Sequence, residues 1–186
     1  GGMARRQHRV LELLAACLES CIEDGEGAGL CARDISNALH ALVKLGHREK
    51  PWALLEAAAS RAEDFNALDT FQLLWAMGRA RMRERRVLGV FEARCVALLP
   101  KLEPFQVANL LWVYTVLEHP APRFFTAALP LLRPSQLHDG SLLSVLWAVA
   151  ATEGLPSAAP ISTLFDAALP SALIRLPNLN ARHVGI

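Results

Sequence analysis

The chain repeats one short string three times, as Gln72-Leu73-Leu74-Trp75-Ala76-Met77, Asn109-Leu110-Leu111-Trp112-Val113-Tyr114 and Ser144-Val145-Leu146-Trp147-Ala148-Val149. A fourth copy, Asn37-Ala38-Leu39-His40-Ala41-Leu42, lies upstream and has histidine at the tryptophan position. From His40 onward this position recurs after 35, 37 and 35 residues. Self-similarity at a fixed period of this length is typical of stacked repeat proteins. The sequence therefore predicts a repeat architecture.

The repeat boundaries follow from a second shared position. Ten residues before the tryptophan position each copy has an apolar residue, namely Leu30, Phe65, Leu102 and Leu137. Four repeats then run over residues 30–64, 65–101, 102–136 and 137–175, with lengths of 35 to 39 residues. We expect a half repeat at 1–29 before them and a partial repeat at 176–186 after them.

Each repeat contains two stretches with apolar residues every three or four positions, the spacing of a helix with one buried face. The first stretches are Leu39/Leu42/Leu45, Leu73/Met77/Ala80, Leu110/Tyr114/Leu117 and Leu146/Val149/Ala150. The second stretches are Trp52/Leu55/Ala58/Ala59, Leu88/Phe91/Cys95/Leu98, Phe125/Ala128/Leu129/Leu132 and Phe165/Ala168/Leu169/Ala172. Residue types that start or stop helices flank them: Asp34 and Asp69 as N-caps, Pro104 in a first turn, and Gly46, Pro120 and residues 154–156 as stops.

A lone helix pair cannot bury both of its faces, whereas stacked pairs bury each other. No stretch alternates with the period of two that indicates a strand. We therefore expect an all-α protein, a right-handed α-solenoid of two-helix repeats of 35–39 residues that forms a single domain over residues 1–186. An irregular helical bundle is the alternative fold.

The first helices resemble those of octotricopeptide and heptatricopeptide repeat proteins, which are related to FAST-kinase-like and RAP-domain proteins. Their typical string is L-x-N-x-L-W-A-x-A-x-L-G, which residues 107–114 and 143–150 resemble, as do residues 35–46 with His40 replacing tryptophan. The resemblance implies an RNA-binding protein of an organelle, the mitochondrion or alternatively the chloroplast. Such a protein would bind ribosomal RNA or an organellar transcript, and neighbouring proteins of a large complex.

The residues that would contact phosphates follow the first helices of two repeats. Residues 79–86 hold five arginines and one glutamate, and residues 44–50 are also basic. In a solenoid these turns would line one edge, where cations could neutralise a phosphate backbone; a solvated charged loop is the alternative. The candidates are Lys44, Arg48, Lys50, Arg79, Arg81, Arg83, Arg85 and Arg86.

The position three residues before the tryptophan is polar in every repeat, as Asn37, Gln72, Asn109 and Ser144. These side chains could pair with base edges, one nucleotide per repeat, or could hydrogen-bond one repeat to the next. The tryptophans could stack on bases. Because they sit in fixed phase beside leucines, we expect them to fill the core between repeats instead.

Other classes of function find little support in the sequence. We expect no enzyme, cofactor or metal site, because phosphate-loop, Gly-x-Ser-x-Gly, His-Glu-x-x-His and Cys-x-x-Cys patterns are all missing. The four cysteines are interpreted as reduced, buried thiols. A content of 53% hydrophobic residues excludes a disordered chain, and no apolar run is long enough for membrane insertion. With a net charge of +1, a protein-binding scaffold subunit of a large complex, with no direct RNA role, is the alternative function.

Overall fold

The computed structural model describes residues 30–47 and 50–151, together with positions 9, 12, 13, 15–18, 20, 166, 170 and 174. The fold is all-α, as the sequence predicts, and the described residues contain no strand. The chain divides into two compact units, Gly1–Arg94 and Cys95–Ile186. The predicted half repeat, the stop at 154–156, the stretch from Phe165 to Ala172 and the partial repeat fall outside the described residues, apart from isolated helical positions.

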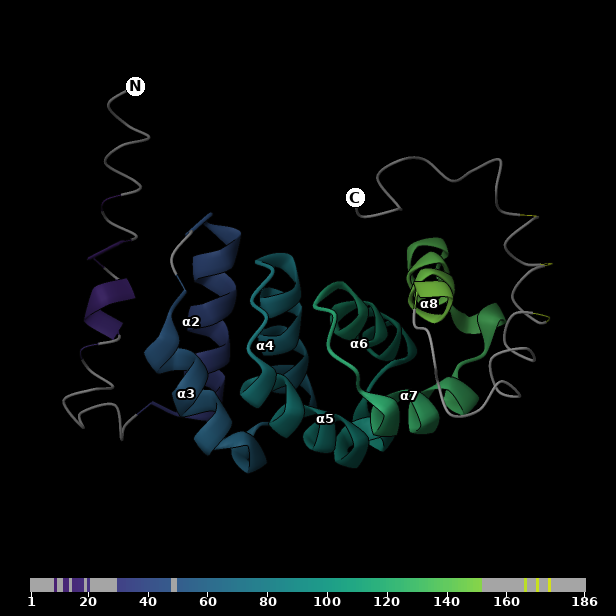
Figure 1. The fold of residues 1–186 in the computed structure, drawn as a ribbon, viewed down its shortest axis with the longest axis horizontal. Helices are drawn as coiled ribbons and strands as arrows, with labels where there is room; N and C mark the ends of the chain where they lie inside the picture. The colour runs from purple at the N-terminus through teal and green to yellow at the C-terminus, as the bar shows by residue number, and fades with distance from the viewer. Residues whose placement is uncertain are drawn as a thin grey trace, which may run out of the picture. The chain divides into compact units, whose positions relative to one another are not determined.

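The first unit contains α2 (Ala32–Lys44), α3 (Trp52–Ser60), the 3-10 turn η2 (Ala62–Asp64) and α4 (Ala67–Arg79). Helix α2 packs against both α3 and α4, and α2 and α4 lie side by side (Figure 1). Helix α5 (Arg85–Leu98) begins in this unit and carries the chain into the next.

The second unit continues with η3 (Leu99–Lys101), α6 (Pro104–Val116) and α7 (Pro122–Ala128). After η4 (Leu129–Leu131) and η5 (Pro134–Gln136) the chain enters α8 (Asp139–Ala151), which packs against α6. Pro130 lies in η4, two residues after the last residue of α7, where a proline opposes continuation of the helix.

The first helices confirm the predicted phase. Helices α2, α4, α6 and α8 each contain 13 residues and begin two residues after the apolar residue that opens their repeat. The tryptophan position is therefore the ninth residue of every one of these helices. Pro104 is the first residue of α6, as predicted.

The N-caps are Cys31 and Asn66, so the prediction of Asp34 and Asp69 as caps is wrong by three residues. Asn66 Oδ1 accepts the Asp69 N–H at 2.9 Å, whereas the Asp34 carboxylate reaches back to the Cys31 N–H at 2.9 Å. Hydrogen bonds from the Cys31 side chain and backbone lower the pKa of Asp34 below its ordinary value. Aspartate fits both the N-cap and the third helical position of a capping box. The sequence alone therefore placed each cap three residues too late.

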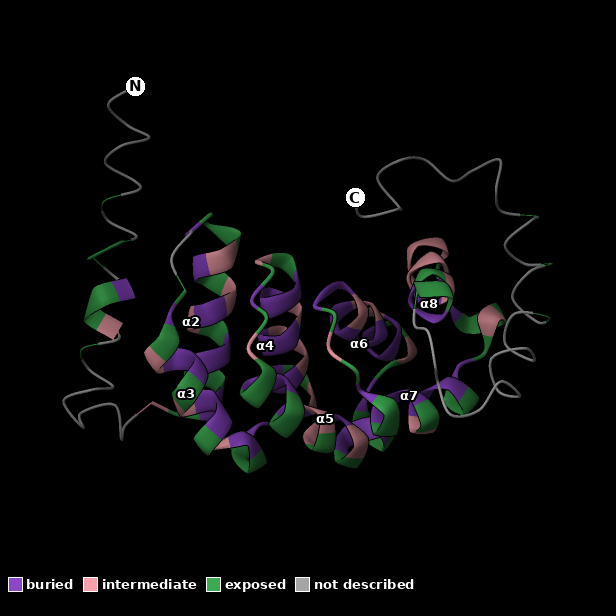
Figure 2. Ribbon diagram, viewed as in Figure 1, coloured by how far each residue is buried: buried purple, intermediate pink, exposed green. Residues whose placement is uncertain are grey.

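The core consists of the apolar residues on the inner face of each helix. Leu39, Leu73 and Leu110 are fully buried, and Phe65 packs edge-on against Phe91 with ring centroids 5.1 Å apart. Each such side chain contributes about 1.5–3 kcal/mol through the apolar surface it removes from water. Figure 2 shows the buried residues alternating with exposed ones along the helices.

Three residues that the sequence places on buried helix faces, Trp52, Leu45 and Ala150, are exposed instead. Trp52 is 50% exposed because it is the first residue of α3, where the Lys50 ammonium lies 5.1 Å from its ring centroid. Leu45 is 61% exposed because α2 ends one residue before it. Cys17 and Cys31 are also exposed, against the expectation of buried thiols, while Cys95 is buried.

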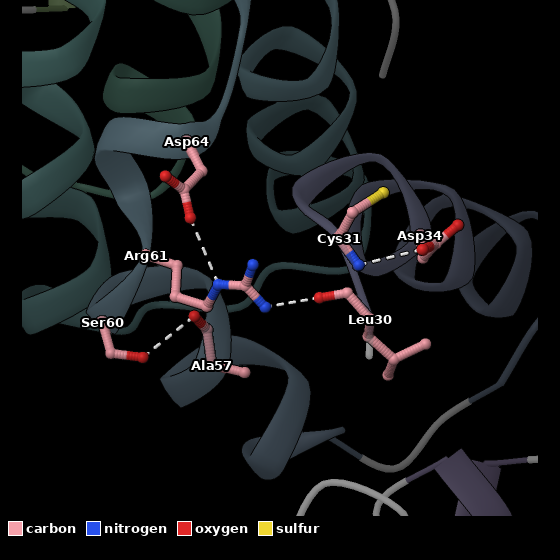
Figure 3. Close-up of polar contacts among 7 residues, drawn as sticks. All are labelled: Leu30, Cys31, Asp34, Ala57, Ser60, Arg61 and Asp64. Atoms are coloured by element: carbon pink, nitrogen blue, oxygen red, sulfur yellow. Dashed lines mark hydrogen bonds and ion pairs between the residues drawn. The ribbon is translucent and has the colours of Figure 1, made fainter. Parts of the chain in front are cut away.

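In the first unit, an arginine from the second half of each repeat donates a hydrogen bond to the backbone carbonyl of the residue that opens the repeat. The Arg61 guanidinium donates to the Leu30 carbonyl and pairs with Asp64 at 3.2 Å (Figure 3). In the next repeat Arg94 Nε donates to the Phe65 carbonyl at 2.8 Å. Because an unpaired carbonyl at a helix start is costly, these bonds fix where each repeat begins.

Three first helices end in the same hydrogen-bond pattern, with a left-handed residue two positions after the last helical one. These residues are Gly46 (φ 81°), Arg81 (φ 55°) and Glu118 (φ 53°). In each case the next N–H bonds back to the third residue from the helix end, as His47 N–H does to the Leu42 carbonyl at 2.9 Å. Gly46 thus acts as the predicted stop, while arginine and glutamate take the same strained conformation elsewhere.

We expect Arg81→Gly to stabilise the protein by about 0.5–1 kcal/mol, since glycine adopts a positive φ without the steric cost that arginine bears. Urea denaturation would measure the gain as a higher midpoint at an unchanged slope. Arg81→Ala is the matched control, because it removes the same side chain but keeps the strain. Equal midpoints for the glycine and alanine variants would contradict the prediction.

Candidate nucleic-acid interface

Helices α2 and α4 each present an outward face formed by their second, sixth, ninth and thirteenth residues. This spacing brings residues to one side of a helix. On α2 and α4 every residue at these positions is exposed or half-buried, whereas neighbours such as Leu39 and Leu73 are fully buried. The face consists of Arg33, Asn37, His40 and Lys44 on α2 and of Leu68, Gln72, Trp75 and Arg79 on α4.

Trp75 lies at the centre of this face rather than in the core. The Arg79 guanidinium carbon lies 5.7 Å from its ring centroid, and the His40 ring meets it edge-on at 5.2 Å. Arg79 is one helical turn after Trp75, and His40 occupies the tryptophan position of the preceding repeat. A half-buried indole beside a guanidinium and an imidazole can stack on a planar ligand and hold an anion near it.

The expectation that the tryptophans fill the core is therefore wrong for Trp147, which is 45% exposed, and only half correct for Trp75 and Trp112, which are half-buried. The inward positions beside Trp75 are taken by Leu74 and Ala76, which are fully buried. Adjacent residues on a helix point about 100° apart, so the ring is turned away from the core by its neighbours.

The four base-facing candidates have different surroundings. Asn37 is exposed and Asn109 is half-buried. Gln72 Oε1 accepts a hydrogen bond of 3.4 Å from Ser36 Oγ on α2, which is the repeat-to-repeat link that the alternative interpretation expects. Ser144 Oγ donates to the Gly140 carbonyl of its own helix at 2.9 Å.

The two basic turns of the first unit meet in space. Lys50 Nζ lies 3.5 Å from Glu84 Oε1, which brings the turn after α2 to the turn after α4. Arg86 pairs in the same way with Glu56 on α3. The seven described phosphate candidates all belong to this unit and are exposed, and Arg48 lies outside the described residues.

In the second unit the equivalent positions carry no cations. The thirteenth residues of α6 and α8 are Val116 and Ala151, where α2 and α4 have Lys44 and Arg79. The left-handed residue after α6 is Glu118 in place of Arg81. The restriction of cations at these positions to the N-terminal half agrees with the uneven distribution of basic turns in the sequence.

Sequence reasoning missed the cluster of His40, Trp75 and Arg79. Two spacings could have revealed it: the 35 residues between His40 and Trp75, and the single helical turn between Trp75 and Arg79. The sequence did not indicate that the ninth residue of α2 and α4, the tryptophan position, faces outward.

No protein-family model matches this chain, and no curated protein matches it in sequence. Within residues 30–47 and 50–151 and the other described positions, every helix is too short or too polar to cross a membrane.

We expect Glu84→Gln to tighten the binding of inorganic polyphosphate by about two- to fivefold, because it removes the carboxylate beside Lys50. Isothermal titration calorimetry at low salt would measure the affinity. Glu92→Gln, a change of the same type on α5, is the matched control and should alter the affinity less. An unchanged affinity for Glu84→Gln would show that the turn carrying Lys50 contributes nothing to polyanion binding.

Proposed function

We propose that this protein is an RNA-binding right-handed α-solenoid whose first unit holds single-stranded RNA on the outward face of α2 and α4. The solenoid is supported by four first helices of equal length and by contacts between neighbouring repeats at equivalent or adjacent positions. His40 meets Trp75 and Ser36 meets Gln72, each pair joining α2 to α4.

The observation that carries the proposal is the composition of this face. It combines an amide that can read a base edge (Asn37), an aromatic ring (Trp75) and cations for phosphate (Lys44 and Arg79). Proteins that bind unpaired nucleic acid join such rings to a positively charged surface. A face built only for another protein would be depleted of charge at its centre.

The basic turns extend the cationic surface beyond the helices. Lys50 and the exposed side chains of residues 79–86 lie next to the end of this face, where α2 and α4 terminate. Phosphate contacts of this kind release counterions, so the affinity should fall steeply as salt is raised. Glu84 and Glu56 hold two of the cations in place, and phosphates would compete with these acids.

The cellular setting of the proposal rests on the likeness of the first helices to octotricopeptide repeats. In this proposal the chain is a mitochondrial protein that either contacts ribosomal RNA within the ribosome or matures or stabilises a transcript. The chloroplast is the alternative organelle. A scaffold subunit that binds only proteins is the competing function. The exposed aromatic residues Phe105 and Trp147 of the second unit favour at least one further contact there.

We expect the triple substitution of Arg81, Arg83 and Arg85 by glutamate to abolish most RNA binding. Three cation–phosphate contacts would become repulsive, and the dependence of log K on log salt for single-stranded RNA would become shallower by about 2. Fluorescence anisotropy with a labelled oligoribonucleotide, over a series of salt concentrations, measures both quantities.

A matched triple variant separates a local site from a general charge effect. Substitution of Lys101, Arg123 and Arg133 by glutamate changes the net charge equally but acts in the second unit. This variant should retain RNA affinity to within about threefold, because it leaves the cations of the first unit in place. Equal losses in the two triple variants, with both folded by circular dichroism, would refute a site on the first unit.

A further inference from the structure

Trp147 differs from Trp75 in what lies one helical turn after it. Arg79 lies over the Trp75 ring, whereas the corresponding residue of α8 is Ala151, whose methyl group is too short to cover an indole. Trp147 is 45% exposed, whereas Trp75 is half-buried. An indole is the largest apolar surface that a side chain can offer, and leaving it in water forgoes the stabilisation of burial.

The outward-face positions of α6 and α8 around Trp147 carry uncharged residues, some of them polar. On its own helix the outward face contains Gly140, Ser144 and Ala151. On the neighbouring helix α6 the same positions hold Phe105, which is 43% exposed, followed by Asn109 and the half-buried Trp112. An amide and a hydroxyl thus stand three residues before the two tryptophans, one turn away on the same face.

We infer that the outward face of α6 and α8 binds an unpaired nucleobase by stacking on Trp147. Asn109 and Ser144 would meet the polar edge of that base or of its neighbour. This inference rests on the proposed function and deepens it, since it adds a base contact in the second unit to the contacts proposed for the first. The ligand is a single-stranded nucleic acid, because a base paired within a duplex offers no free ring face.

Two features favour a base over the aliphatic side chains of a partner protein. A base presents a ring face beside hydrogen-bonding groups, which fits an indole one turn from an amide or a hydroxyl. The same helix position carries the ring in every repeat from Trp75 onward, in phase with the polar position before it. A protein interface has no need of that regular pairing at its centre, where polar groups are costly to bury unpaired.

Stacking and phosphate contacts respond differently to experiment, which makes the inference testable. Loss of one stacked base weakens binding by about tenfold, the equivalent of about 1.4 kcal/mol, and this loss does not depend on salt. Loss of a cation weakens binding less as salt is raised. The affinity for a probe without bases, such as inorganic polyphosphate, should not change when Trp147 is substituted.

The experiment compares Trp147→Ala, Trp147→Phe and Leu131→Ala in binding to a 12-nucleotide oligoadenylate and to polyphosphate. Leu131 is the control, an apolar residue of the same unit that is 59% exposed and lies away from this face. We expect a loss of about tenfold for Trp147→Ala on oligoadenylate at every salt concentration, near-normal binding for Trp147→Phe, and no change on polyphosphate. Oligoadenylate should also quench tryptophan fluorescence less in Trp147→Phe than in the native chain.

The outcomes separate this inference from the function on which it rests. If oligoadenylate binds the native chain in a salt-dependent manner and Trp147→Ala binds equally well, the stacking site is refuted while RNA binding by the first unit stands. The stacking site is refuted in the same way if Trp147→Ala alters only self-association, measured by light scattering. If the native chain binds neither probe, both the proposed function and the stacking site are refuted.

Discussion

The structure depends on the fixed distance between the residue that caps each first helix and the left-handed residue that ends it. Thirteen helical residues separate the two in α2, α4 and α6. Because a helix advances by 100° per residue, this distance fixes which positions face outward in every repeat. An extra residue inside α4 would rotate Trp75 and Arg79 away from their neighbours on α2. The positions at which the helices start and stop therefore determine which residues lie on the outward face, independently of any ligand.

The residue of positive φ that follows a first helix ends that helix, and at Arg81 it is also a candidate for phosphate contact. Gly46 takes a positive φ without cost, whereas Arg81 and Glu118 bear a steric penalty of about 1 kcal/mol each. Strain by itself does not mark a functional residue, since the two strained side chains have opposite charges. It does show that the helix end is imposed by the surrounding repeat rather than by local preference. At Arg81 the turn also exposes a guanidinium beside the end of α4, which under the proposed function would contact a phosphate.

The sequence predicted the spacing of the first helices and the second helices around Phe91 and Phe125, because these depend on apolar spacing that is local and regular. It misplaced the caps by three residues, since aspartate fits both the cap and the third position of a capping box. It also placed the tryptophans in the core. Leucines adjacent to Trp75 made that burial plausible, but only the packing of α2 against α4 decides which of several apolar residues in a row faces inward. Contacts between repeats, such as the hydrogen bond between Ser36 and Gln72, cannot be predicted from the local sequence around either residue.

Equivalent positions with different residues explain how one scaffold can hold two kinds of contact. The ninth residue of each first helix is half-buried or exposed, and the thirteenth is exposed in α2, α4 and α8, so the side chains at these positions decide the chemistry. With Arg79 after Trp75, the ring is partly covered and the surface is cationic. With Ala151 after Trp147, the ring is open and the surface is neutral. Cations attract a polyanion over about 10 Å but weaken with salt, whereas an open indole acts only at contact and is indifferent to salt. Under the proposed function and the proposed stacking site, the chain would attract RNA through one unit and retain unpaired bases through the other at salt concentrations where charge alone fails.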